Sequence, residues 1–156
     1  MKTQRGEEAL KASKEYAKKA RALEKQIKNG VESGEVDIFI NKMPELFSCW
    51  NRWKGSYLVA FIEYLCPKLC WIIEKCESSA REDDQGIAIL AKAHAKNTLE
   101  DMASWALDAT GRRDIGEKIK AISETIDTGK SFRGVLDLLL EVSAELREAQ
   151  GSEPRT

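Results

Sequence analysis

The strongest constraint on this chain is the spacing of its apolar residues, which recur at steps of three and four along nearly every long segment. In the first segment, Ala20, Leu23 and Ile27 fall on one helical face, and Gly30 is a typical residue for ending a helix. No segment alternates apolar and polar residues over the length of a strand. The spacing therefore predicts an all-α protein.

The same spacing predicts where the later helices begin and end. A short helix is expected over 36–43, a second from Pro44, and a break at Gly55 with Ser56 as the next N-cap. A polar loop is expected over 77–86, followed by a helix over 87–109. The last two helices are expected to begin at Asp114 and Ser131, and the first of these to end at Gly129.

The segment 57–76 is apolar on nearly all sides, which is typical of a helix surrounded by other helices. It is long enough to span a membrane, but it contains charges such as Glu63 and Lys68 that are costly in hydrocarbon. Pro67 is expected to kink or break it. We therefore predict a soluble bundle of five to seven helices around this central helix, with no membrane partner.

Composition places the chain among ordinary folded domains. Its 156 residues are 42% hydrophobic and 33% charged, with a net charge of -1, which excludes a disordered chain. We expect one domain over 1–150 and a disordered tail over 151–156. The first thirty residues are densely charged, unlike a signal peptide, so a cytoplasmic location with four free cysteines is expected.

Most catalytic motifs are missing from the sequence. His94 is the single histidine, no Glu-x-x-His pair exists for a di-iron bundle, and no phosphate-binding loop occurs. Neither a catalytic residue nor a cofactor nor a metal is assigned. We expect His94 to pack half-buried and the cysteines to pack as small apolar side chains. The cysteines are Cys49, Cys66, Cys70 and Cys76.

Acidic residues leave one enzyme alternative open. Glu74 and Glu77 are spaced for one helical face, and Glu100 and Asp101 follow on the next helix, so a carboxylate-held magnesium site for nucleotide hydrolysis is the alternative to solvated charges. Glu63, within the apolar segment, is expected to reach the surface, or else to pair with a neighbour or with an arginine of another helix.

Six cations aligned on one face of the first predicted helix form the clearest candidate binding surface in the sequence. They recur at steps of 3, 4, 3, 4 and 3 and fall within about 100° of the helix, opposite its apolar face. Residues 1–30 hold nine Lys or Arg against four Glu, a net charge of +5, whereas the other 126 residues carry -6. A solvated helix face is the more common role of such a row, and binding of an anionic partner, nucleic acid or an acidic protein surface, is the candidate function. We call this set the basic face: Lys11, Lys14, Lys18, Arg21, Lys25 and Lys28.

A second candidate surface is aromatic. Trp50 and Trp53 lie beside Arg52, and an exposed tryptophan there would be a contact site for a protein partner, although core packing is the more common role of large aromatic residues.

Residues 42–47, Lys-Met-Pro-Glu-Leu-Phe, and 55–61 faintly resemble stretches in the small helical subunits of type III CRISPR RNA-guided complexes. The resemblance implies an all-α, non-catalytic subunit with basic surfaces that line nucleic acid.

The sequence thus predicts a non-catalytic helical interaction or assembly protein with a protein partner or self-association. The alternatives are a nucleic-acid-associated helical subunit, which binds independently of base sequence through the basic face, and the magnesium-dependent hydrolase.

Overall fold

The structure is a computed structural model that describes residues 2–128 and 131–151. Every regular element in those residues is helical, which confirms the predicted all-α class. A π-helical turn, η1 (Phe61–Leu65), joins α2 to α3, and a 3₁₀ turn, η2 (Thr125–Thr128), follows α5. The α-helices are α1 (Lys2–Glu32), α2 (Val36–Ala60), α3 (Cys66–Glu77), α4 (Glu82–Thr110), α5 (Arg113–Glu124) and α6 (Phe132–Gly151).

The helices α2 and α3 and the turn between them form one continuous helix of 42 residues. The predicted break at Gly55 and Ser56 is therefore wrong, and Pro44 lies inside α2 rather than at a helix start. Gly55 has a packing role instead, because a Cβ there would lie only 2.8 Å from the Cβ of Ala109 in α4. Close packing between the helices outweighs the weak helix propensity of glycine.

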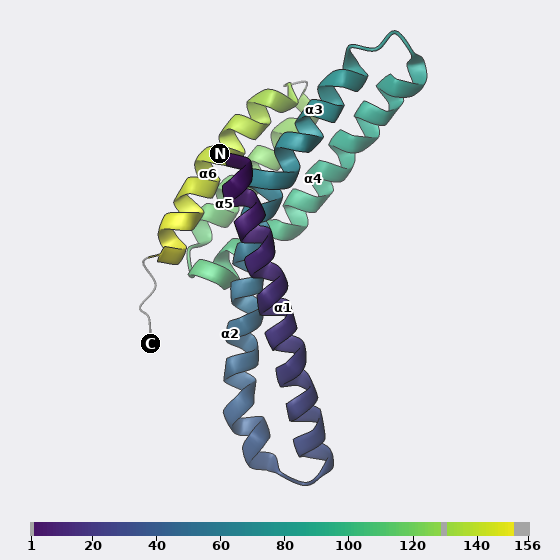
Figure 1. Ribbon diagram of the computed structural model, residues 1–156. Coiled ribbons are helices and arrows are strands. Elements are labelled where there is room, and N and C mark those ends of the chain that lie inside the picture. The colour runs from purple at the N-terminus through teal and green to yellow at the C-terminus, as the bar shows by residue number, and fades with distance from the viewer. Residues whose placement is uncertain (1, 129–130, 152–156) are drawn as a thin grey trace.

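The predicted kink at Pro67 is confirmed, and it takes the form of a π-turn. Pro67 has no N–H to donate, and its ring displaces the carbonyl four residues earlier, that of Glu63. The backbone is π-helical immediately before this proline, and α3 then leaves at an angle to α2 (Figure 1). A local widening of the helix thus accommodates the proline without ending the chain of helical turns.

Two pairs of antiparallel helices project from a common body (Figure 1). We call residues 11–50 the α1–α2 arm and residues 69–95 the α3–α4 arm; α5 and α6 pack where the arms meet. The α1–α2 arm has a small apolar cluster of its own, built on Ala20, Ile27 and Leu46. The main core fills the body and continues into the α3–α4 arm, with fully buried residues that include Leu58, Ile62, Leu99, Ile119 and Leu139.

The 42-residue helix is long and apolar enough to cross a membrane by length and composition alone, and 44% of its most apolar window is buried. This burial is consistent with the core helix of a soluble protein. The helix is not surrounded on all sides, however. Trp71 is 61% exposed and Ile72 is 43% exposed, so the expected enclosure of 57–76 is wrong at its end.

The ends of the other helices differ in part from the prediction. α4 begins at Glu82, so the expected long loop shortens to 78–81. Ser131 is confirmed as a cap, because its Oγ accepts a hydrogen bond from the N–H of Gly134 at 3.3 Å. Asp114 lies inside the first turn of α5 instead of capping it. The predicted stop at Gly129 and the predicted tail over 152–156 lie outside the described residues, and Gly151 ends α6.

Candidate functional site

All six residues of the basic face are exposed on the α1–α2 arm. The opposite side of α1 is buried against α2 through Ala17, Ala20 and Ile27, and this contact fixes the direction in which the cations point. In the described part of the chain, none of the six forms an ion pair with a carboxylate. The row spans about 25 Å at ~1.5 Å per residue.

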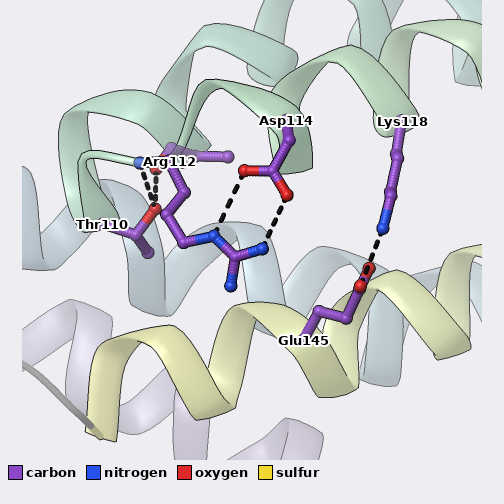
Figure 2. A network of polar contacts seen from close by, with 6 residues as sticks. Thr110, Arg112, Asp114, Lys118 and Glu145 are labelled. Atoms are coloured by element: carbon purple, nitrogen blue, oxygen red, sulfur yellow. Dashed lines mark hydrogen bonds and ion pairs between the residues drawn. The ribbon is translucent and has the colours of Figure 1, made fainter.

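Several cations in the body are paired, in contrast to those of the basic face. Figure 2 shows the junction of α4 and α5, where both Nε and Nη2 of Arg112 donate to the carboxylate of Asp114, the latter at 2.6 Å. Nearby, Nζ of Lys118 in α5 donates to Glu145 in α6 at 2.7 Å. The guanidinium of Arg112 holds the pKa of Asp114 below its usual value. These ion pairs engage cations of the body with partners in the same chain.

The candidate aromatic surface is mostly an internal contact. The ring of Trp53 lies 5.1 Å from that of Trp105 in α4 and 5.6 Å from that of Tyr57, between centroids. Trp50 meets Trp53 edge to face at 5.4 Å, and both tryptophans are half-buried. Arg52 is exposed. The cluster joins α2 to α4.

Glu63 is buried and paired, so the expectation that it reaches the surface is wrong. Its side chain is 8% exposed and lies in the π-turn, where it faces α6. Arg147 donates from Nε to Oε2 at 2.6 Å and from Nη2 to Oε1 at 3.1 Å, and the hydroxyl of Ser143 donates to Oε2 at 2.6 Å. The alternative expectation, pairing with an arginine of another helix, is confirmed. Three charge-assisted hydrogen bonds offset much of the cost of burying the carboxylate.

The carboxylates of the hydrolase alternative do not converge on a metal site. Glu74 accepts a hydrogen bond from Nη2 of Arg133 at 2.5 Å, and this pairing lowers the pKa of Glu74. Glu77 pairs with Lys92, and Oε1 of Glu100 lies 3.8 Å from Nζ of Lys96. Across residues 2–128 and 131–151, no group of three or more His, Cys, Asp or Glu side chains is arranged to hold a metal ion. The geometry gives this alternative, which also needs Asp101, no support.

Among the described residues, neither the cysteines nor the histidine is arranged as a catalytic or metal-binding site. Cys66 and Cys70 are fully buried, and burial raises the pKa of the Cys66 thiol to about 12 and also raises that of Cys70. Such thiols are protonated and inert near neutral pH. Cys49 and Cys76 are half-buried and free. His94 is exposed on α4, so the expected half-buried packing role is wrong.

Exposed apolar side chains concentrate on the two arms, which the sequence did not predict. Outside the arms, Leu107 is the one large apolar residue in the described structure that is similarly exposed. Helical spacing indicates a packed face, but it does not say whether the partner helix belongs to the same chain. The exposed residues of the α1–α2 arm are Val31, Val36, Phe39, Ile40 and Phe47, and those of the α3–α4 arm are Trp71, Ile72, Ile87, Ile89 and Leu90.

Comparisons of this chain with protein-family models, with curated proteins and with solved structures found no match. The resemblance of residues 42–47 and 55–61 to CRISPR small subunits therefore gains no support from them.

Proposed function

We propose that this chain is a non-catalytic helical interaction protein whose α1–α2 arm binds an acidic partner through the basic face. The supporting observation is that six exposed cations lie in one row without an ion pair among the described residues. Like charges at three- and four-residue spacing destabilise a helix by a few tenths of a kcal/mol per pair. Negative charges on an acidic partner would attract the cations and offset the repulsion among them.

The position of the arm favours this role. The α1–α2 arm extends away from the body (Figure 1), and α2 already covers the apolar side of α1. A partner therefore reaches the cations without any helix having to separate. Binding through exposed charges is fast and sensitive to salt, because surface charges are screened over about 10 Å at 0.1 M ionic strength.

Nucleic acid is the second candidate partner. A straight row of cations about 25 Å long matches the reach of several backbone phosphates. The basic face carries no aromatic side chain for base stacking, so such binding is expected to be independent of base sequence.

The test reverses three charges of the basic face, with Lys14, Lys18 and Lys25 each replaced by Glu. Fluorescence anisotropy at low salt measures binding to polyglutamate and to mixed-sequence RNA and DNA. We expect the variant to lose at least about tenfold in affinity for its preferred polyanion. The matched control reverses Lys19, Arg113 and Lys120, which are exposed cations outside the basic face, and is expected to bind as the wild type does.

The two partner classes give different results in the same experiment. Tight binding to nucleic acid, with log affinity falling steeply against log salt, favours the nucleic-acid candidate. Preference for polyglutamate favours an acidic protein. Equal loss in the control variant, or no polyanion binding by the wild type, would refute a specific role for the basic face.

A further inference from the structure

Each arm presents apolar side chains that nothing in the described structure covers. On α2, Ile40 is 62% exposed and Phe47 is 60% exposed; on α4, Ile89 is 69% exposed and Leu90 is 61% exposed. Soluble proteins rarely leave contiguous apolar patches open, and such patches mark interaction sites. Both arms therefore have uncovered apolar side chains, and the arms themselves extend in different directions (Figure 1).

On the α1–α2 arm, the exposed apolar residues of α2 lie on the same side as one edge of the basic face. Lys28 directly follows the buried Ile27 on α1, and Phe47 directly follows the buried Leu46 on α2. Each is thus turned by about 100° in the same sense about its own helix axis. Because the two helices are antiparallel, both turns lead to one side of the arm. This side is apolar along α2 and is bordered along α1 by Lys28, at the edge of the basic face.

The α3–α4 arm has the complementary character. Of the five acidic residues between 74 and 90, Glu74 and Glu77 pair with Arg133 and Lys92 of the same chain, which leaves the carboxylates at the start of α4 as the acidic part of the arm. The first turn of α4 contains Glu82, Asp83 and Asp84, of which Glu82 and Asp83 are exposed. Ile87 and Leu90 follow within two turns. An apolar surface edged with acid thus lies on one arm, and an apolar surface edged with base lies on the other.

We infer that the α3–α4 arm of one copy of this chain docks on the apolar and basic side of the α1–α2 arm of the next copy. This inference rests on the proposed function and names a second copy as the acidic partner. The contact is head to tail, because it joins two different surfaces. After one such contact, each of the two copies still has one unoccupied docking surface. Further copies therefore add to form an open chain, or the chain closes into a ring.

The first experiment measures the molar mass of nuclease-treated full-length protein by sedimentation velocity, at concentrations up to about 100 µM, the range of weak association. We expect the mean mass to rise with concentration beyond that of a dimer at low salt. At about 500 mM salt, where charges are screened over a few Å, it falls back towards the monomer.

Two variants separate the arms: Ile40→Ser with Phe47→Ser, and Ile87→Ser with Leu90→Ser. All four residues are exposed, so both variants are expected to keep the helical circular dichroism of the wild type. Leu107→Ser, an exposed apolar residue of the body, is the matched control and assembles as the wild type does. Each arm variant alone remains monomeric. An equimolar mixture of the two forms a 1:1 dimer and nothing larger, because one intact surface of each kind remains.

Three results overturn the inference. One is a wild-type protein that stays monomeric throughout. Another is a variant of the α3–α4 arm that assembles as the wild type does, which indicates contact between like arms. The third is a mixture that grows beyond the dimer. If the wild type is monomeric but still binds polyanions through the basic face, this inference fails while the proposed function stands.

Discussion

At the scale of single residues, the contact between Glu63 and Arg147 ties the π-turn to α6. The carboxylate is nearly inaccessible to water and accepts hydrogen bonds from two side chains of α6. A buried carboxylate without its cation is strongly unfavourable, whereas the intact pair adds little net stability over apolar residues of the same size.

Replacing Arg147 by Met is therefore expected to lower the free energy of unfolding by about 3 kcal/mol, because Glu63 is left buried and uncompensated. Urea denaturation followed by circular dichroism measures this. In the double variant with Glu63→Leu and Arg147→Met, much of the loss is recovered. The control Arg133→Met breaks the exposed pair with Glu74 and costs no more than about 1 kcal/mol. Equal effects of the two arginine substitutions would contradict this account.

The sequence indicates that Glu63 is unusual, since it is a charge within an apolar segment, but the identity of its partner is not contained in local spacing. Arg147 is 84 residues away along the chain. Only the packing of α6 against the π-turn brings the two together, and helical periodicity carries no information about which helices become neighbours.

At the scale of helices, glycines decide how closely α1 and α2 approach their partners. A Cβ on Gly6 of α1 would lie 2.6 Å from the Cβ of Tyr64 and 2.9 Å from the backbone carbon of Glu63. These neighbouring atoms are backbone atoms or a Cβ attached directly to the backbone, so they cannot move aside as the end of a flexible side chain could. Gly86 also lies within a helix, α4, but nothing is within 4 Å of the corresponding position.

Replacement by Ala should therefore have opposite effects at these two glycines. Gly6→Ala is expected to destabilise the protein by about 1–3 kcal/mol through overpacking. Gly86→Ala is expected to stabilise it by about 0.5–1 kcal/mol, because alanine is the better helix former. Thermal unfolding measured in parallel for both variants tests this. A stabilising effect of Gly6→Ala would mean that α1 does not pack against the π-turn.

The spacing of apolar residues identified the helical segments, but it misjudged where helices end, since α1 runs past Gly30 to Glu32 and the two helices expected on either side of Pro44 are one helix, α2. Gly55, Ser56 and Pro44 are reasonable breakers by local propensity, and yet α2 runs through all three. Contacts of α2 with α1, α4 and α6 outweigh the low helix propensity of these residues. Rules based on local sequence cannot predict such tertiary contacts. Ser131, whose role depends on its own helix alone, was identified correctly.

At the scale of the whole molecule, the two arms are unequally supported. The α1–α2 arm is held by a small cluster of three buried residues and their partly buried neighbours, separate from the main core that extends into the α3–α4 arm. Regions with few buried apolar contacts open locally at lower cost than the rest of the fold.

Hydrogen exchange measured by mass spectrometry is expected to show this difference. Backbone amides of residues 21–50 should exchange faster than those of α5 and α6, which contribute to the main core. Leu46→Ala, which removes a buried side chain of the arm, should accelerate exchange within the arm and leave α6 unchanged. Uniform exchange across the chain would show that the arm and the body open as one unit.

The exposure and alignment of the six cations could be predicted because they depend on one helix alone, whereas the arms were not predicted. Whether two antiparallel helices pack along their whole length or extend beyond the body depends on the lengths of all the elements together. The apolar residues of 36–47 have the spacing of a core face, and the structure leaves several of them uncovered.

The π-turn before Pro67 also sets the rotational phase of everything that follows it. A π-helical turn accommodates one residue more than an α-helical turn. Deleting a single residue from Phe61–Leu65 and restoring regular α geometry would rotate α3 by about 100° about its own axis. Cys66, Cys70 and Ile73 would swing out of the interior and Trp71 towards it, so the orientation of half the molecule is encoded by one surplus residue at its centre.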